Sequence, residues 1–299
     1  MTDRCMLNGF AADLGGTKIA AARVEKGVVA SRLLAPTQSS ADAQTQLGTI
    51  AGLLARLGYE SGAPLGLAVA GRVDAGGHWH AVNRGTLSAI DGVPLATLAA
   101  RILGPATCLN DAAAAALAEA RYGTGHGSDS FAYLTISTGV GGGLVSGGHL
   151  LRSANGLAGH VGFASSRFAD VACESGRSGT VESVAGGRAI AAAGHAVGHS
   201  VDARMVFDAA AAGAPWAERI VARSASAVAA LIADLAAILG VDTVAIGGSI
   251  GMAPGYLDRV RIALDTEPNL FRPAVALAVL GHDAPLIGAL AAHLEGDAR

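Results

Sequence analysis

The sequence predicts an α/β fold built from two domains. Segments with strand character alternate with helical segments along the 299 residues, which is typical of this class. A pattern of strand, glycine-rich turn and further strands occurs twice, at residues 8–34 and 131–151, and suggests two related halves. We expect a smaller domain from 1–112 together with 286–299, and a larger one from 113–285.

The first half is predicted to contain three strands, two helices with a buried strand between them, and a third helix. Residues 8–34 give the three strands, two of them joined by the turn "LGGT". Helices are expected at 45–58 and 94–103, with the buried strand at 64–71. The segment 110–123, "NDAAAAALAEARYG", begins with capping residues and ends in glycine, as a helix does.

The second half repeats the strand pattern and then becomes helical. Strands at 131–151 surround the turn "GVGGG", and helices are expected at 184–195 and 215–239, the latter beginning with proline. Residues 241–251, "VDTVAIGGSIG", predict a strand, a glycine turn and a helix start. The last helix, at 284–294, is expected to pack on the N-terminal domain and so to make it discontinuous.

Composition excludes several classes of protein. The net charge of −3 and the lack of a basic stripe argue against a nucleic-acid partner. Apolar runs are interrupted, for example by Asp234, so neither a membrane span nor a membrane partner is expected. The N-terminus does not resemble a signal peptide, and three dispersed cysteines fit a reducing compartment. These features predict a cytoplasmic protein.

Two glycine-rich turns are candidates for contacts with phosphate. "DLGGTK", residues 13–18, offers backbone N–H groups, the hydroxyl of Thr17 and a carboxylate, Asp13, that can hold hydrated Mg²⁺. "STGVGGG", residues 137–143, offers two hydroxyls and four glycines but lacks the ending of a P-loop. Taken singly, the first segment could equally be an ordinary tight hairpin, and the second could be a mobile hairpin. Together they support two phosphate-binding hairpins.

Three further segments have both structural and functional interpretations. In "LND", Asn110 is expected mainly to cap the following helix, and Asp111 is a candidate general base. "GGS", residues 247–249, would let backbone amides approach an adenosine or its phosphates, although the pattern alone is weak. His160 is a candidate metal ligand, acid/base or sugar partner, yet a lone histidine is more often a satisfied polar residue.

These segments, with "CESGRSGTVE" at 173–182, resemble in order and spacing the ROK family of sugar kinases and sugar-responsive repressors, over nearly the whole chain. The resemblance implies an actin-like ATPase fold of two RNase H-like domains, with ATP and sugar meeting in a cleft. It implies Asp111 as catalytic base and Asp13 near Mg²⁺. Expected sugar contacts are Gly71, Asn83, Thr86, Asn110, Asp111, His160 and Glu182. Expected ATP contacts are Asp13, Gly15, Gly16, Thr17, Lys18, Thr138, Gly139, Gly141, Gly142, Gly247 and Gly248.

The resemblance also exposes departures from the family pattern. Thr86 replaces an asparagine that commonly contacts the sugar, although a hydroxyl can still bond there. The family's zinc ligands, one histidine and three cysteines, correspond here to Phe163, Cys173, Ser175 and Thr180. Only one of the four ligands, Cys173, remains, so no structural zinc is expected. Burial of the Phe163 ring is our hypothesis for what replaces the metal.

The resemblance implies an ATP-dependent kinase, and His160 favours N-acetylmannosamine as the sugar that is phosphorylated on its 6-hydroxyl. Glucokinases and fructokinases of the family usually carry glutamate at this place. A glucokinase or a broad hexose and hexosamine kinase is the alternative. A sugar-binding regulator without catalysis is less favoured, because a strand begins by about residue 8 and leaves no room for a DNA-binding helix-turn-helix. A homodimer is expected by resemblance.

Overall fold

The computed structural model describes residues 4–83, 87–169 and 171–296. Its internal contacts divide the chain into unit 1, formed by Met1–Gly123, Gly143–Gly159 and Leu280–Arg299, and unit 2, formed by Thr124–Gly142 and His160–Val279. The sequence predicts that 113–285 form the larger domain, whereas the contacts group 113–123, 143–159 and 280–285 with unit 1.

Unit 1 contains a five-stranded mixed sheet of order β3-β2-β1-β4-β8. Its strands are β1 (Gly9–Leu14), β2 (Lys18–Glu25), β3 (Val28–Pro36), β4 (Leu65–Val69) and β8 (Thr107–Asn110). β1, β2 and β3 pair antiparallel because tight turns join them. β4 lies parallel to both β1 and β8, since helices provide the connections. These bounds confirm the three expected N-terminal strands and the buried strand.

Helices cover both faces of this sheet. α1 (Ala43–Arg56) and α2 (Leu95–Ile102) share one apolar core with the sheet, which includes Leu67 of β4. α3 (Asp111–Tyr122) and α10 (Ala284–Glu295) share a second core, which includes the next residue of β4, Ala68. Successive strand residues point to opposite faces, so β4 is buried on both sides.

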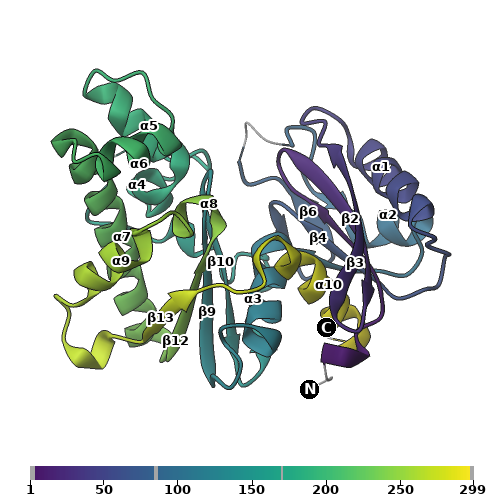
Figure 1. Ribbon diagram of the computed structural model, residues 1–299. Helices are drawn as coiled ribbons and strands as arrows, with labels where there is room; N and C mark the ends of the chain where they lie inside the picture. Colours follow the sequence, from purple (N-terminus) through teal and green to yellow (C-terminus); the bar gives the residue numbers. More distant parts are fainter. Residues whose placement is uncertain (1–3, 84–86, 170, 297–299) are drawn as a thin grey trace. The chain divides into compact units, whose positions relative to one another are not determined.

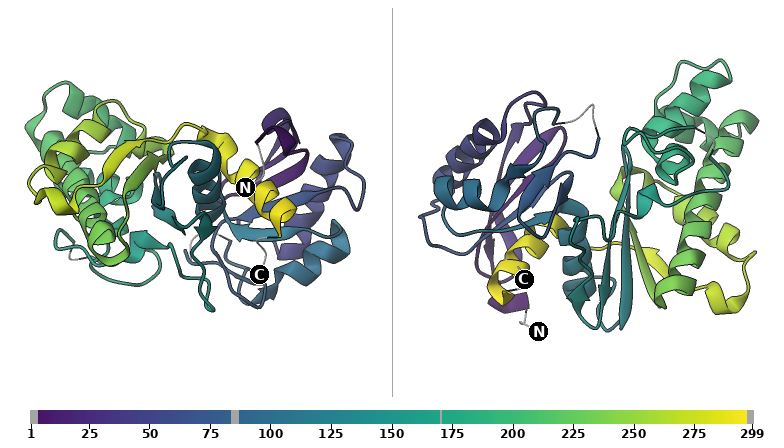
Figure 2. Two further views of the ribbon diagram at one scale, coloured as in Figure 1. Left: turned by 90° about the horizontal axis from the view of Figure 1, so that it is seen from below. Right: turned by 180° about the vertical axis from the view of Figure 1, so that it is seen from behind.

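The C-terminal helix α10 packs on unit 1, as expected from the sequence. It contacts α3, β4 and β1, and it lies beside the first strands in Figures 1 and 2. Two glycines allow the close approach. A Cβ at Gly66 would collide with the backbone of Ala289, and one at Gly288 would collide with the carbonyl of Ala114. Gly288 therefore serves packing.

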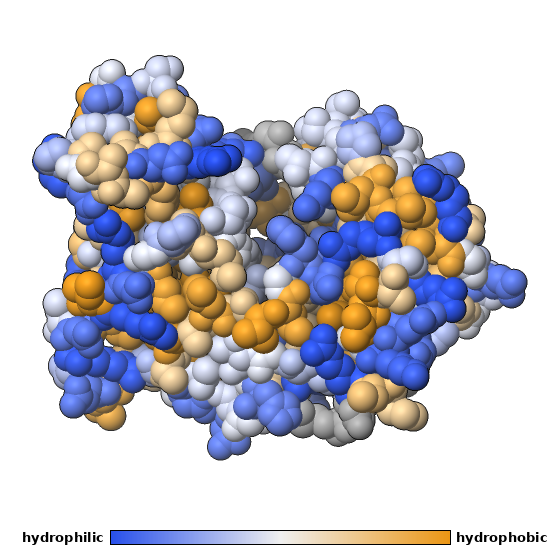
Figure 3. Space-filling view, in the orientation of Figure 1, coloured by the Kyte–Doolittle hydropathy of each residue, from blue (hydrophilic) through white to orange (hydrophobic). Residues whose placement is uncertain are grey.

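Two smaller features of unit 1 bear on the site and the surface. A three-stranded sheet is formed by β5 (Arg72–Val73), β6 (His78–His80) and β7 (Val93–Pro94). The edge strand β3 exposes Val28 and Leu34, and Figure 3 shows apolar surface gathered over β2 and β3. Arg32 interrupts the apolar residues of β3, which discourages pairing with another strand.

Unit 2 is built on strands of a second mixed sheet, of order β11-β10-β9-β12-β13. The strands are β9 (Ser130–Ile136), β10 (Val140–Ser146), β11 (His149–Leu150), β12 (Thr243–Gly247) and β13 (Ala274–Leu277). β12 pairs parallel to both β9 and β13. The end of β10 and the whole of β11 are grouped with unit 1.

The helices of unit 2 are α4 (Glu182–Ala185), α5 (Gly187–Ala196), α6 (Ala203–Ala211), α7 (Pro215–Leu239), α8 (Gly248–Gly251) and α9 (Tyr256–Leu264). By length and composition α7 could cross a membrane, but 56% of the window that passes this test is buried. α7 contacts α4, α5, α6 and α9, so it is the core helix of this unit. Its bounds are those expected from Pro215 and the left-handed Gly240 that ends it.

The helix expected at 184–195 is in fact two helices, α4 and α5. The break is at Gly186, whose backbone is extended. A Cβ there would lie 3.1 Å from both Cα of Gly139 and the carbonyl oxygen of Thr138. The chain therefore bends where Gly186 passes the second glycine hairpin. The hydrophobic periodicity of the sequence does not reveal such a contact, because the two segments are far apart along the chain.

Candidate functional site

The hairpin between β1 and β2 presents the first expected phosphate contacts. Gly15 donates its N–H to the carbonyl of Lys18 at 3.0 Å, which closes the turn. Thr37, beyond β3, donates its hydroxyl to the carbonyl of Gly15 at 2.8 Å and its N–H to that of Thr17 at 3.0 Å. Thr17 and Lys18 are exposed, while Gly16 is partly exposed. A neighbouring strand end thus supports the hairpin through neutral groups.

Asn110 and Asp111 occupy the junction of β8 and α3. Oδ1 of Asn110 accepts the N–H of Ala113 at 2.9 Å, which confirms Asn110 as the cap of this helix. Its Nδ2 donates to the carbonyl of Gly71 at 2.7 Å and to Oδ1 of Asp111 at 2.8 Å. Oδ1 of Asp111 also accepts the N–H of Ala112 at 2.8 Å. These bonds fix one carboxylate oxygen of Asp111 and thereby orient the other.

The carboxyls of Asp13 and Asp111 are electrostatically unusual. Burial raises the pKa of Asp111 to about 6. Burial, and next the charge of Asp111, raise the pKa of Asp13 to about 7 against the opposing charges of Lys18 and Arg32. Buried carboxyls with raised pKa values that face one another are typical of functional sites.

This pair fits a hydrated divalent cation. Oδ1 of Asp13 is buried, and no residue in the described part of the chain donates a hydrogen bond to it. A hard cation such as Mg²⁺ prefers oxygen ligands and usually keeps several waters. Its charge would also relieve the repulsion between the two carboxylates, so Asp13 is suited to hold Mg²⁺ through water.

The loop that carries Gly71 is fixed by side chains that the sequence analysis did not single out. The carbonyl of Gly71 holds Asn110, and a Cβ at Gly71, with φ of +97°, would collide with the carbonyl of His80. Oδ1 of Asp74 accepts the N–H groups of Gly76 and His78, both at 2.9 Å. The bond from the N–H of His78, with those from the side chains of His80 and His78, lowers the pKa of Asp74 to about 2 against the effect of burial. In the sequence, the only indication of this support was Asp74 itself, which ends the segment "AGRVD" at residues 70–74.

Two other expected sugar contacts belong to this region. Asn83 is partly buried, and within residues 4–83, 87–169 and 171–296 nothing donates to its Oδ1. An amide oxygen that accepts no hydrogen bond from the protein is suited to accept one from a sugar hydroxyl. Thr86 lies outside the described residues.

The second glycine hairpin, between β9 and β10, carries Thr138, Gly139, Gly141 and Gly142. Ser137 donates its N–H to the carbonyl of Gly139 at 2.9 Å, which closes the turn. The N–H of Val140 donates to Oε2 of Glu182 at 3.0 Å. Glu182, expected only as a sugar contact, therefore also touches this hairpin.

The turn after β12 lies beside the same hairpin. The backbone at Gly248 is left-handed, with φ of +84°, and a Cβ there would collide with the carbonyl of Ile136. The hydroxyls of Ser137 and Ser249 lie 3.1 Å apart. Gly248 and Ser249 thus lie beside Ile136 and Ser137, at the start of the second hairpin and within unit 2.

The comparisons with known proteins bear on what these features do. The sequence matches the ROK family over residues 10–295. The chain belongs to the ROK family. It is 42% identical over 284 residues to a bifunctional enzyme NanE/NanK of Brucella melitensis, covering 93% of this chain but only 52% of that protein. The chain thus spans about half the length of that relative. It is 39% identical to an N-acetylmannosamine kinase of Citrobacter koseri, covering 95% of this chain and 97% of that one.

Solved structures of the ROK family share the fold. A ROK hexokinase from Thermus thermophilus superposes with a TM-score of 0.83 at 33% identity, covering 97% of this chain and 99% of that one. A ROK glucokinase from Streptomyces griseus, in complex with glucose and AMPPNP, has a TM-score of 0.77 at 27% identity, covering 97% and 100%. The predicted actin-like α/β fold is therefore confirmed.

His160 and Phe163, two positions where the chain was compared with ROK relatives, lie together. Their rings are stacked, with centroids 6.0 Å apart and an interplanar angle of 17°. Phe163 is partly buried, and the hypothesis that its ring replaces a zinc ligand stays a prediction. The residue belongs to a short helical turn, Val161–Phe163, and its ring stacks on that of His160.

The remaining residues at the ROK zinc positions make hydrogen bonds within the protein. Sγ of Cys173 lies 2.9 Å from Oγ of Ser175. Thr180 pairs with Ser165 in an isolated antiparallel bridge, and its hydroxyl accepts the N–H of Ser183 at 3.2 Å. In the described part of the chain, no group of three or more His, Cys, Asp and Glu side chains is arranged to hold a metal ion. The absence of zinc stays a prediction.

Arginine side chains fasten the same segment. Arg177 donates from Nη2 to Oγ of Ser165 at 3.0 Å, and Arg223 of α7 donates from Nε to the carbonyl of Phe168 at 2.9 Å. Arg188 of α5 forms an ion pair with Glu174. These bonds connect the segment to two helices, and we infer that they order it without a metal.

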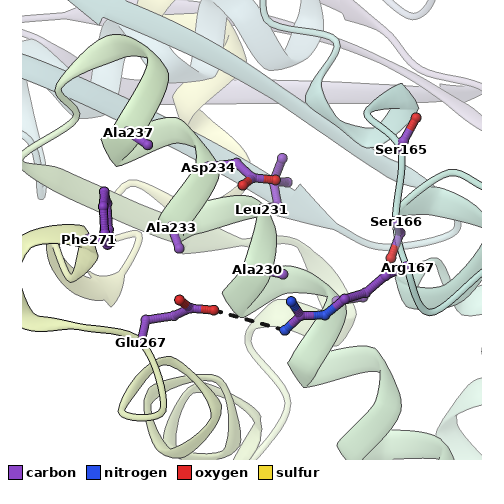
Figure 4. Close-up of a pocket in the computed structure, with 11 residues that line it drawn as sticks. Ser165, Ser166, Arg167, Ala230, Leu231, Ala233, Asp234, Ala237, Glu267 and Phe271 are labelled. Carbon is purple, nitrogen blue, oxygen red and sulfur yellow. Dashed lines mark ion pairs between the residues drawn. The ribbon is translucent and has the colours of Figure 1, made fainter.

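A cavity of about 360 Å³ lies on another side of this segment. Ser165, Ser166 and Arg167 line one wall, and α7 with Glu267 and Phe271 line the rest (Figure 4). Arg167 and Glu267 face each other, with Nη2 and Oε1 3.9 Å apart. None of the expected sugar or ATP contacts lines it, so it does not belong to the candidate site of this ROK protein.

Proposed function

We propose that this chain is an ATP-dependent sugar kinase that phosphorylates the 6-hydroxyl of N-acetylmannosamine. The observation that carries the proposal is Asp111, an oriented carboxylate with a pKa raised to about 6 at the start of α3. A general base is most effective when its pKa lies near the working pH. Identity of 39% to an N-acetylmannosamine kinase of nearly equal length supports the choice of sugar.

In the proposed reaction Asp111 accepts the proton of the sugar hydroxyl while that oxygen attacks the γ-phosphorus of ATP. The new P–O bond forms as the bond to the β-phosphate oxygen breaks, and ADP leaves. Asp111 then gives the proton to solvent. Asn110 keeps Asp111 oriented and is itself held by the carbonyl of Gly71. Catalysis of this kind depends on positioning and charge stabilisation.

Each glycine hairpin is expected to supply contacts to the phosphates of the nucleotide. Backbone N–H groups and hydroxyls of Thr17 and Thr138 are suited to bind phosphate oxygens. Asp13 would hold magnesium through water, and magnesium bound with ATP neutralises charge on the phosphates. The structure of the Streptomyces griseus relative contains AMPPNP, which supports an ATP substrate here.

Sugar-dependent formation of ADP tests the proposal. Wild-type protein is given MgATP with N-acetylmannosamine, N-acetylglucosamine, mannose or glucose, and Asp111→Asn controls for contaminating kinases. We expect a marked preference for N-acetylmannosamine that is lost in the variant. Turnover of any sugar that is equal in Asp111→Asn would contradict the assignment of the base.

A glucokinase or a broad hexose kinase is the second candidate, favoured by the names of the two similar structures. His160 distinguishes the two, because glucokinases of the family usually carry glutamate there. His160→Glu should lower kcat/KM for N-acetylmannosamine and raise it for glucose, with His160→Gln as the matched control. Wild-type preference for glucose would select this candidate. Binding of a sugar without any turnover would select a regulator.

A further inference from the structure

The second glycine hairpin is supported by a set of contacts that engage its carbonyl groups. The N–H of Gly187, at the start of α5, donates to the carbonyl of Ser137 at 2.7 Å. The N–H of Arg188 donates to the carbonyl of Thr138 at 3.2 Å. Carbonyl oxygens repel phosphate, so fixing them against α5 leaves the N–H groups of the hairpin available for an anion.

Glu182 holds the hairpin at a further point, the N–H of Val140. Its side chain is 9% exposed, and Oε2 accepts the N–H of Val140 at 3.0 Å. A Cβ at Gly139 would collide with the same oxygen, so the carboxylate lies directly against the backbone of the hairpin. Loss of this acceptor would leave a buried N–H without its partner, which is costly.

Placing a carboxylate beside a phosphate-binding hairpin has an electrostatic cost. Burial raises the pKa of Glu182, while the bonds from Val140 and from the side chain of Cys173 oppose this rise. A neutral acceptor would support the hairpin without repelling phosphate. The charge therefore points to a second use of the carboxylate, such as accepting a strong, charge-assisted hydrogen bond from a hydroxyl.

We propose that Glu182 is a positioning residue for the nucleotide as well as a sugar contact. Through Oε2 it fixes Gly139 and Val140 in the geometry that binds ATP phosphates, and its other lone pairs accept a sugar hydroxyl. Cys173 and Glu174 hold the segment that precedes Glu182, through the contact of Cys173 with Ser175 and the ion pair of Glu174 with Arg188. The inference rests on the proposed kinase function of the same site.

The test measures nucleotide affinity in the absence of any sugar. Binding of AMPPNP with magnesium is followed by calorimetry for wild type, Glu182→Ala, Glu182→Gln and Asn83→Ala. We expect Glu182→Ala to weaken binding about tenfold. Glu182→Gln keeps an acceptor for Val140 and should stay within about threefold of wild type. Asn83→Ala removes an expected sugar contact in unit 1 and should not change nucleotide affinity.

Two results would overturn the proposal. One is wild-type affinity for AMPPNP in Glu182→Ala, which would leave Glu182 with a sugar role alone. The other is an equal loss in Glu182→Gln and Glu182→Ala, because the bond to Val140 needs an acceptor and not a charge. If Glu182→Ala does not fold, Glu182→Asp replaces it, since the shorter side chain withdraws the carboxylate from Val140. Unchanged affinity in Glu182→Asp would then also overturn the proposal.

Steady-state kinetics provide a second readout. Glu182→Ala should raise KM for both ATP and the sugar, whereas Asn83→Ala should raise KM for the sugar alone. The calorimetric measurement is made without sugar, so it tests the role of Glu182 in nucleotide binding even if N-acetylmannosamine is not a substrate. Failure of the proposed function would appear instead as wild-type protein that forms no ADP with any sugar.

Discussion

The two units carry similar glycine hairpins but use their carboxylates in opposite ways. In unit 1 the hairpin is held by neutral bonds from Thr37, and the carboxylates of Asp13 and Asp111 have raised pKa values. In unit 2 the hairpin is held by the carboxylate of Glu182. We infer from this difference that the carboxylates of unit 1 are the reactive groups, whereas the carboxylate of Glu182 in unit 2 positions a hairpin.

The largest expected effect comes from Asp111→Asn in unit 1. Loss of the general base should lower kcat by a factor of about 10²–10⁴. Affinity for AMPPNP without sugar should change less than about threefold, since Asp111 is expected to contact the sugar and is not among the expected ATP contacts. If kcat of Asp111→Asn is within tenfold of the wild-type value, the inference that unit 1 supplies the reactive groups is wrong.

Stability provides the control for this variant. The pKa of Asp111 is raised to about 6 in the folded protein, so its charge destabilises the fold above that pH and the cost disappears as pH falls to the unfolded value. Asp111→Asn should therefore unfold at the same or a higher temperature than wild type at pH 8. A lower unfolding temperature would mean that a loss of activity reports misfolding.

The pH dependence of wild-type activity is the next largest effect. Asp111 must be ionised to accept a proton, and its pKa is about 6. With saturating MgATP, kcat should fall about tenfold for each pH unit below 6. The measurement is kcat between pH 4.5 and 8.5, with the enzyme returned to pH 8 to exclude denaturation. Full activity at pH 5 would contradict the assignment.

Alanine at matched positions of the two hairpins sharpens the comparison. At Gly139 a Cβ would collide with Oε2 of Glu182, whereas at Gly15 it would lie 3.2 Å from the carbonyl of Lys18. We expect Gly139→Ala to raise KM for ATP about tenfold and Gly15→Ala about threefold, because overpacking costs about 1–3 kcal/mol. Equal effects would show that the two hairpins are supported alike.

Thr37→Val tests the neutral support of the first hairpin. Valine keeps the shape of the side chain and removes the hydroxyl that donates to the carbonyl of Gly15. A neutral hydrogen bond contributes about 0.5–1.5 kcal/mol, so KM for ATP should rise about threefold with kcat unchanged. Thr49→Val in α1, which removes a hydroxyl that donates to the carbonyl of Thr45 and is remote from the expected site, is the matched control. A loss as large as that of Glu182→Ala would remove the contrast between neutral and charged support.

The smallest expected effect is that of metal chelation on unit 2. Arginine and backbone bonds hold the segment around Cys173, which retains one of the four zinc ligands of the family. Treatment with a zinc chelator should leave the unfolding temperature of the nucleotide-free protein within about 1 °C, because a bound structural zinc would contribute many kcal/mol. One tightly bound zinc per chain, measured by elemental analysis, would contradict this prediction.

Local sequence determined the parts of this protein whose causes lie within a few residues. The strands on both sides of "LGGT" and "GVGGG", the helix from Pro215 to Leu239 and the cap by Asn110 were all predicted, since turns, proline and capping groups act locally. The order of motifs was enough to indicate the ROK family. The break at Gly186 was missed, and so were the small sheet β5–β7, strands β8 and β13, and helices α6 and α9.

Tertiary structure alone decided which side chain supports which loop. Glu182 and Val140 are 42 residues apart, and Gly71 and Asn110 are 39 apart, so no periodic pattern connects them. The raised pKa values of Asp13 and Asp111 likewise arise from burial, which depends on how the whole unit packs. The sequence determined the chemical groups that this protein can use, and folding decided which of them react and which only hold others in place, because contacts and desolvation are properties of the packed chain.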